Sequence, residues 1–393
     1  MNELTCFSNA MVLVGDELEV IHNGTITVQA GRIVQIGEPA PDNARVEDMA
    51  GRLLCPMLIN AHTHVGDTGA KELGVGLPLA QVTDPPDGLK HVFLQSVKGT
   101  ELHVAMMRHG LLEMLHNGII AVADFREQGL AGVRALRRAG EGLPVRVVAL
   151  GRMSEGHDAD ALEREAHAIL EEADGLGVRD VEAYPSALLR KLRAAYPRKI
   201  LAAHTSEDYA SEMHSRSQTG MGQAGRLLEW QPDFLVHLTY TPEEELRRLV
   251  EEGIGAVACP RSNGILGDGL PRLVDWVESG LRFALGTDNV MFNSPDMLRE
   301  MDYASRLVRG MWRNAAVLEP RHFLMAATIQ GARVLHLDRD LGSLLPGKEA
   351  SFIVFNLNTA NLKYQQNVIS AIVHRATLAD IEKIYIRGIE YHS

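Results

Sequence analysis

The sequence LLCPMLI at residues 53–59 runs directly into NAHTH at residues 60–64, and this stretch decides how the chain is interpreted. A continuously apolar run predicts a strand that is covered on both faces. Side chains two positions apart on a strand point to the same face, so His62 and His64 can both reach one metal ion. A histidine pair in a polar loop is the alternative, and the remaining sequence has to discriminate between the two.

Three later apolar runs also end in a residue that can bind a metal. They end in His204, His237 and Asp288, and Glu207 lies three residues after His204. A single histidine after an apolar run is more often a hydrogen-bonded core residue than a ligand. Four such strand ends in one chain, one of them with a histidine pair, favour a metal site.

From residue 58 onward the sequence predicts eight units of a strand followed by a helix. Helical patterns include residues 101–116, 159–173 and 242–252, with Pro242 expected in a first helical turn and Thr241 as its N-cap. Eight such units predict an α/β fold, the (β/α)8 TIM barrel, whose functional groups gather at the carboxyl ends of the strands. The strands are expected near residues 58–62, 119–124, 145–150, 176–182, 200–204, 234–238, 254–259 and 281–287.

Both ends of the chain predict short strands with glycine turns between them, such as residues 24–29, 32–37 and 351–357. A chain of 393 residues also exceeds what a single hydrophobic core usually organises. We therefore expect two domains. Residues 1–54 and 346–393 form a composite β-sandwich from both termini, and residues 55–345 form the barrel.

Composition narrows the class of partner and the compartment. The net charge of −12 argues against nucleic acid and against an anionic membrane, which leaves a small-molecule substrate. The three cysteines are odd in number and show no C-x-x-C spacing, so we expect a reducing compartment and a cytoplasmic location. No signal peptide or membrane-spanning stretch is recognisable. A homodimer is expected only as the commonest oligomer.

The motifs at the strand ends resemble those of the amidohydrolase superfamily, in particular its branch of cytosine deaminases and chlorohydrolases. The resemblance covers nearly the whole chain and implies a (β/α)8 barrel, a β-sandwich built from both termini, and metal-dependent hydrolysis. It is carried by NAHTH at 60–64, HTSE at 204–207, His237, CPRSN at 259–263, GDGLP at 267–271, GTD at 286–288, AATIQGARVL at 326–335 and LGSLLPGK at 341–348.

The resemblance also bears on the metal. We expect one divalent ion held by His62, His64, His204 and Asp288. Zinc suits three imidazoles, a carboxylate and a water, with iron or manganese as alternatives. Relatives with two metals bridge them by a lysine or glutamate from the region of the fourth strand. Residues 175–182 contain no lysine, and we expect the acidic residues there to lie in a solvated loop.

Three residues are candidates for moving protons. Asp288 can bind the metal and accept a proton from the attacking water, which a divalent ion makes acidic near pH 7. Glu207 is placed to carry a proton to a ring nitrogen or to the leaving amine; its alternative is an exposed residue in a first helical turn. His237 can hydrogen-bond the water or the developing oxyanion, or be a direct ligand.

Two arginines at strand ends are candidates for binding the substrate. Arg126 follows the second strand and Arg152 the third, so both guanidinium groups should point toward the mouth of the barrel. A carboxylate or another planar acceptor suits such groups. The alternative is a salt bridge to Asp124, Glu127 or Glu155.

Two further features should border the same pocket. Ser262 and Asn263 are expected at the end of the seventh strand and to contact substrate. Residues 65–94 are rich in glycine and proline, including Pro78, Pro85 and Pro86. This stretch is too long for a plain connection, so we expect it to cover the mouth as a lid.

Together these observations predict a metal-dependent hydrolase of C–N bonds other than peptide bonds. Deamination of a heterocyclic amine is the favoured reaction, and hydrolysis of a cyclic amide or an acyl-amino compound on the same centre is the alternative. A non-catalytic scaffold of the same fold is disfavoured, because such proteins usually lose metal ligands and this chain has the full set.

Overall fold

The computed structural model describes residues 4–84, 86–154 and 158–392. The chain folds into two compact units. One unit comprises Met1–Ile59, Leu115–Ile120 and Met297–Ser393, and the other comprises Asn60–Met114 and Ala121–Asp296. No helix among the described residues is both long and apolar enough to cross a bilayer.

The second unit is built around a parallel sheet whose strands follow one another in chain order. Their order in the sheet is β13-β12-β11-β10-β9-β8-β7-β6-β14. Each predicted strand is present, although the fourth ends at Val178 rather than near residue 182. The strands are β6 (Leu58–His64), β7 (Ile119–Arg126), β8 (Arg146–Gly151), β9 (Gly175–Val178), β10 (Ile200–Thr205), β11 (Phe234–His237), β12 (Gly255–Ala258), β13 (Phe283–Leu285) and β14 (Asp288–Asn289).

The eighth strand closes this sheet on itself because it is split into two pieces. β13 pairs with β12, whereas β14 pairs with β6 in the register Asp288 with Thr63. The two pieces stand at opposite ends of the strand order but are separated in the chain only by Gly286 and Thr287. A Cβ on Gly286 would lie 2.7 Å from the Cβ of His62, so only glycine fits at this crossing. The predicted (β/α)8 barrel is thereby confirmed.

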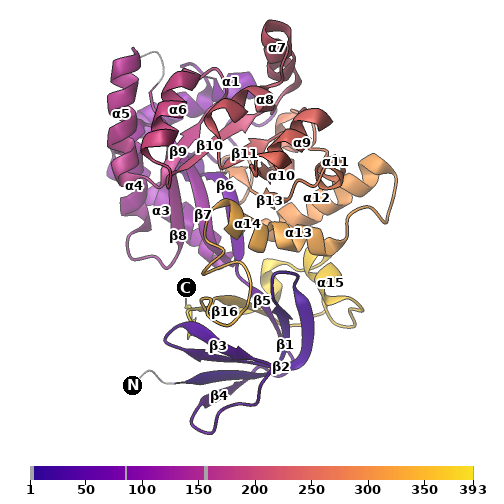
Figure 1. Cartoon of the computed structure of the whole chain (residues 1–393). Coiled ribbons are helices and arrows are strands. Elements are labelled where there is room, and N and C mark those ends of the chain that lie inside the picture. Colours follow the sequence, from indigo (N-terminus) through magenta and orange to yellow (C-terminus); the bar gives the residue numbers. More distant parts are fainter. Residues whose placement is uncertain (1–3, 85, 155–157, 393) are drawn as a thin grey trace. The chain divides into compact units, whose positions relative to one another are not determined.

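Helices follow the strands as expected, and Figure 1 shows α4, α5 and α6 outside β7, β8 and β9. α3 (Glu101–His116), α5 (Ala159–Glu172) and α9 (Glu243–Glu251) agree with the predicted ranges within a residue. The prediction that Thr241 caps α9 is wrong: Pro242 is the N-cap and makes no side-chain capping bond. The other helices of this unit are α4 (Gly129–Gly140), α6 (Ser186–Ala195), α7 (Tyr209–Thr219), α8 (Gln223–Leu227), η2 (Leu228–Trp230), α10 (Pro260–Leu266) and α11 (Leu273–Glu278).

The segment expected to act as a lid contains short helices. They are η1 (Val65–Ala70), α1 (Leu79–Thr83) and α2 (Leu89–Val97), while Pro85 lies outside the described residues. Ala70 and Val82 from this segment form a buried apolar cluster with Leu266, the last residue of α10, and with Met291 and Phe292 after β14. The segment is therefore packed against residues that follow the carboxyl ends of β12 and β14.

The first unit contains a sheet to which both ends of the chain contribute, as predicted. Its order is β17-β16-β15-β5-β1-β2-β3, with β4 beside β1. Aromatic and aliphatic side chains such as Phe7, Phe352 and Tyr385 fill its core. The strands are β1 (Thr5–Val14), β2 (Glu19–Gln29), β3 (Arg32–Ile36), β4 (Arg45–Asp48), β5 (Leu53–Pro56), β15 (Phe352–Phe355), β16 (Ile381–Ile386) and β17 (Ile389–Glu390), and the helices are α12 (Met297–Trp312), α13 (Pro320–Ala326), α14 (Ile329–Val334), α15 (Val368–His374) and η3 (Leu378–Asp380).

Candidate active site

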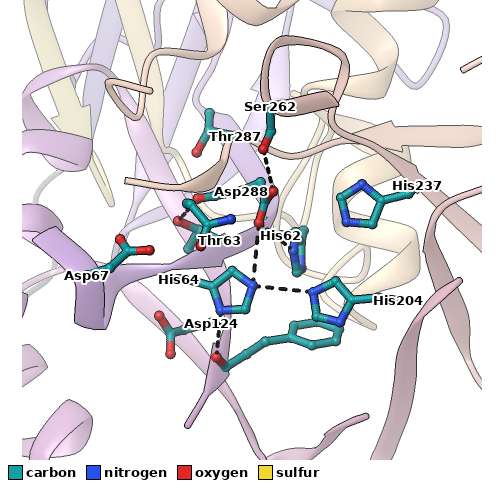
Figure 2. Close-up of polar contacts among 12 residues, drawn as sticks. His62, Thr63, His64, Asp67, Asp124, His204, His237, Ser262, Thr287 and Asp288 are labelled. Carbon is teal, nitrogen blue, oxygen red and sulfur yellow. Dashed lines mark hydrogen bonds and ion pairs between the residues drawn. The ribbon is translucent and has the colours of Figure 1, made fainter. Parts of the chain in front are cut away.

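Four predicted ligands from four points of the barrel converge on one place. His62 and His64 come from β6, His204 from β10 and Asp288 from β14. Figure 2 shows their side chains pointing toward one another. Asp288 Oδ1 lies 3.2 Å from His62 Nε2 and 3.4 Å from His64 Nε2, and the Nε2 atoms of His64 and His204 are 3.3 Å apart. One donor atom from each residue lies within 4.8 Å of all the others.

These separations fit a metal ion. Two ligands at about 2.0–2.1 Å from a tetrahedral ion are about 3.3–3.4 Å from each other. The spacing between the donor atoms of His64, His204 and Asp288 matches this value. Three imidazoles and a carboxylate are also the ligand types that zinc takes in catalytic sites. These four residues therefore fit the divalent metal ion that the sequence predicts.

Backbone carbonyls fix the orientation of two of the imidazoles. His64 Nδ1 lies 3.1 Å from Phe125 O, and His204 Nδ1 lies 3.2 Å from Val178 O. A carbonyl oxygen only accepts, so each Nδ1 carries the hydrogen and donates it, which leaves the lone pair of Nε2 for a metal. Burial, reinforced by the charge of Lys90, lowers the pKa of His64 to about 3. A neutral imidazole is the form that ligates metals.

Asp288 is held in a specific conformation. Its φ is 58°, in the left-handed region that costs a non-glycine residue roughly 1–3 kcal/mol. Ser262 Oγ donates to Asp288 Oδ2 at 2.5 Å, and Thr63 Oγ1 donates to the Asp288 carbonyl at 3.0 Å. Burial alone would raise the pKa of Asp288, but His62 and the neighbouring imidazoles hold it well below its usual value. The carboxylate is therefore ionised in the folded protein.

A pair of side-chain hydrogen bonds ties the first strand to the eighth beside these ligands. Asn60 Nδ2 donates to Thr287 Oγ1 at 2.7 Å, and Thr287 N donates to Asn60 Oδ1 at 3.0 Å. Both residues are fully buried. These two hydrogen bonds fix the register in which Asp288 pairs with Thr63.

Glu207 and His237 form a second group beside the first. His237 Nε2 lies 3.5 Å from Glu207 Oε1, and His237 Nδ1 lies 3.2 Å from the side-chain nitrogen of Asn263. Burial, together with the charges of Asp288 and Asp268, raises the pKa of Glu207 well above its usual value. Burial lowers the pKa of His237 to about 4. Burial thus favours the neutral form of both the carboxyl group and the imidazole.

The acidic residues after the fourth strand belong to neither group of donors found among the described residues. Asp180 pairs with Arg179 at 2.9 Å, and Glu182 pairs with Arg226. Glu207, His237 and Asp288 form the second donor group, which shares Asp288 with the first. The described residues therefore offer no separate carboxylate from the fourth strand to bridge two ions.

A cavity of about 120 Å³ opens onto proposed metal ligands and onto Glu207 and His237. His64, His204, Glu207, His237 and Asp288 line it together with Thr83, Asp84 and Lys90 from the expected lid and with Arg152 and Asn289. Its volume is below the roughly 300–1,000 Å³ that pockets for drug-sized ligands have. The site therefore suits a small molecule, and the lid segment forms part of its wall.

The two arginines expected to bind substrate differ in their surroundings. Arg126 is fully buried, does not line the cavity, and pairs with Glu127 and with Asp124 at 3.4 Å. This placement agrees with the alternative of a salt bridge and not with a group facing the substrate. Arg152 lines the cavity, and no ion pair joins it to a described residue. Glu155 lies outside the described residues.

Ser262 and Asn263 also lie differently from the expectation. Both are in the first turn of α10 rather than at the end of a strand, and neither lines the cavity. Their side chains contact Asp288 and His237 instead. Their position therefore suits holding the reactive groups rather than touching the substrate.

Sequence reasoning missed the part that two polar residues take in the site. Lys90 and Glu127 are buried and contact each other beside His64, and Lys90 also contacts Asn289, which directly follows Asp288. From the sequence, Glu127 was expected only as a possible salt-bridge partner of the strand-end arginines. Its position directly after a strand end was a usable signal, whereas nothing in the sequence around Lys90 distinguishes it from a surface lysine.

Comparison with known proteins agrees with this geometry. The model of the amidohydrolase family matches residues 53–388. A putative aminohydrolase of Methanothermobacter thermautotrophicus is 37% identical over 314 residues, covering 78% of this chain and 80% of that protein. A 5-methylthioadenosine/S-adenosylhomocysteine deaminase of Thermodesulfovibrio yellowstonii is 26% identical over 94% of this chain and 89% of its own length.

A solved structure extends the similarity to the fold. The crystal structure of an adenosine deaminase from Xanthomonas campestris with bound zinc superposes with a TM-score of 0.86. It covers 99% of this chain and 92% of that one at 22% identity, which supports the fold alone. With the barrel, the converging donors and a family match over most of its length, the chain belongs to the amidohydrolase family.

Proposed function

We propose that this protein is a metal-dependent hydrolase of C–N bonds other than peptide bonds, and that it deaminates a heterocyclic amine. The observation that carries the proposal is the convergence of His62, His64, His204 and Asp288 on one point of a cavity that Glu207 also lines. A site with metal donors, a carboxylate beside them and a protonated acid has the parts that hydrolysis at an amine-bearing carbon requires. A non-catalytic scaffold would not need the acid.

We assign one divalent ion to the site, with zinc as the favoured metal. Such an ion would lower the pKa of a bound water to roughly 7 and so supply the nucleophile. The adenosine deaminase of similar fold contains zinc, and the donor set here matches zinc chemistry. Iron and manganese are the alternatives.

The protein's own groups carry the protons in this proposal. Asp288 is ionised, so its carboxylate can accept a proton from the attacking water. The raised pKa of Glu207 favours the protonated form of its carboxyl group, which can donate to the ring nitrogen or the departing amine. His237 is neutral and 3.5 Å from Glu207, where it can hydrogen-bond the developing oxyanion. The C–O bond forms from water, the C–N bond breaks, and ammonia leaves.

Relatives and the cavity favour a small amine as substrate. Curated relatives include deaminases of 5-methylthioadenosine and S-adenosylhomocysteine, and the similar fold includes an adenosine deaminase. The cavity volume of about 120 Å³ suits a small heterocycle. Arg152 at the wall offers a guanidinium group to a carboxylate or another planar acceptor of the substrate.

The cellular setting that we propose is the cytoplasm. Cys6, Cys55 and Cys259 are all free and buried, as suits a reducing compartment. Nothing in the donor set requires a second copy of the chain, and a homodimer is proposed only as the commonest assembly.

Ammonia release across a panel of substrates tests the proposal. Zinc-loaded protein is incubated with purine nucleosides, free purines, pyrimidines and pterins that carry an exocyclic amine, and with cyclic amides and acyl-amino compounds as a second arm. We expect ammonia from at least one compound of the first arm. Hydrolysis of second-arm compounds alone would show that the activity is amide hydrolysis and not deamination. No turnover in either arm would refute the proposed activity.

The Glu207→Gln variant is the control for this panel. It keeps the size of the side chain but cannot deliver a proton, so kcat should fall by about 10²-fold or more while metal content stays the same. Elemental analysis and turnover are measured on the same sample. A variant with nearly unchanged turnover would show that Glu207 is not the acid.

A further inference from the structure

Lys90 on α2 is a lysine buried at the wall of the active-site cavity. Its side chain is 6% exposed, and its Nζ lies 2.7 Å from Asn289 Oδ1 and 2.8 Å from Glu127 Oε1. Asp67 Oδ2 is 3.8 Å away. A buried ammonium group is costly unless charges and hydrogen-bond acceptors surround it, and these three side chains provide them. The lysine is therefore held at a defined point rather than directed into solvent.

Both close partners of Lys90 adjoin a proposed metal ligand. Glu127 Oε1 lies 2.9 Å from His64 Nδ1, the nitrogen opposite the one that faces the metal donors. Asn289 directly follows Asp288 and pairs with His64 between β14 and β6. The ammonium group of Lys90 thus contacts Glu127, which adjoins the ligand His64 of the first strand. It also contacts Asn289, which follows the ligand Asp288 of the eighth strand. Phe125 O accepts the hydrogen of His64 Nδ1, and the nearby carboxylate adds a negative charge that increases the basicity of the ring.

The segment that carries Lys90 has few other anchors in this part of the barrel. Of α2, only Lys90, Leu94 and Val97 are buried. The apolar cluster under the lid draws on Ala70, Val82 and the partly buried Leu79 and Phe93. The contacts of Lys90 are a polar side-chain link between α2 and the residues that adjoin the ligands, beside the hydrogen bond that Gln128 Nε2 donates to Leu94 O at 2.6 Å. Displacement of the helix would leave Glu127 without its ammonium partner.

We infer that Lys90 is a positioning residue: its contacts with Glu127 and Asn289 couple the docking of α2 at the cavity wall to the placement of His64 and Asp288. The inference rests on the metal site proposed above. It predicts that the protein retains its metal less well when Lys90 is removed, even though Lys90 is not itself a ligand.

Lys90→Met tests this inference, with Lys71→Met as the matched control. Both variants replace a lysine of the lid region by an apolar side chain of similar length, but Lys71 is 45% exposed and pairs with Glu113 on the surface. Zinc-loaded proteins are mixed with a chromogenic chelator, and the rate of zinc loss is recorded together with the melting temperature of the apo proteins. Lys90→Met should lose zinc at least about tenfold faster than wild type, as is typical when the support of a ligand is removed. Lys71→Met should match wild type.

The outcomes separate this inference from the proposed metal site. Wild-type protein that takes up no zinc would refute the site itself. Wild-type retention of zinc in folded Lys90→Met, or equal acceleration in Lys71→Met, would refute only the role of Lys90. If Lys90→Met does not fold, Lys90→Gln replaces it, because glutamine keeps a donor for Asn289 and removes the charge next to Glu127. The same tenfold criterion then applies.

Discussion

At the scale of single residues, the site depends on which nitrogen of each histidine is left without hydrogen. His64 donates from Nδ1 to Phe125 O on β7, and His204 donates to Val178 O on β9. Each carbonyl belongs to the strand next to that of the histidine in the sheet order. β7 and β9 therefore orient the imidazoles of their neighbours β6 and β10. The Nε2 atoms of His64 and His204 lie 3.3 Å apart.

The two strand-end arginines have different surroundings, and substitution should separate their roles. In Arg152→Ala the loss of a contact to a charged substrate should raise KM by tenfold or more with little change in melting temperature. In Arg126→Ala the carboxylate of Asp124 remains buried without its cationic partner, while Glu127 keeps only Lys90 of its two, which should cost roughly 3–5 kcal/mol of stability. KM and melting temperature are measured on the same samples. A stability loss with unchanged KM in Arg152→Ala would contradict the proposed contact with substrate.

At the scale of elements, the short helix η3 depends on side chains that occupy its first turn. η3 begins with a capping box in which Thr377 and Asp380 bond to each other's backbone. Asp380 Oδ2 accepts hydrogen bonds from Thr377 N and Asn361 Nδ2, both at 2.8 Å, and Oδ1 accepts from Thr359 Oγ1 at 2.6 Å. One carboxylate thus joins residues 359–361 to the turn at residues 377–380 that precedes β16.

This arrangement predicts a pH dependence of stability for Asp380. Burial raises its pKa, but hydrogen bonds from Thr359, Asn361 and Thr377 outweigh burial and lower it below 3.8. A lowered pKa in the folded state means that the stabilisation is complete above about pH 3.8 and is lost as pH falls through the folded value. Asp380→Asn should cost about 1–3 kcal/mol at pH 7. Urea unfolding of both proteins at a series of pH values should show that their difference in free energy of unfolding narrows only below pH 4. A difference independent of pH would contradict this role of Asp380.

At the scale of the whole molecule, the architecture was predictable because the strand-and-helix pattern repeats along the chain. The strand ends that carry His62, His204 and His237 were predictable because continuous apolar runs stop at polar residues. The split of the eighth strand at Gly286 was not, because it depends on how the chain passes from β12 to β6.

The polar surroundings of the ligands were not predictable for a similar reason. Lys90 and Asn289 are 199 positions apart, and only the closed barrel brings them within 2.7 Å. Arg126 ends β7 and Arg152 directly follows β8, but Arg126 is buried and pairs with Asp124 and Glu127. Local sequence places a side chain at a strand end, whereas its partners are set by neighbours that are distant in the chain.

Adding zinc back to metal-free protein tests the central claim most directly. Protein freed of metal by a chelator is titrated with zinc, and ammonia release from a substrate identified in the panel is measured at each addition. We expect no release without metal and a rise that ends at about one ion per chain, because His62, His64, His204 and Asp288 form one donor set. Ammonia release by metal-free protein would contradict metal dependence, and a rise that continues to two ions would contradict the single-metal site.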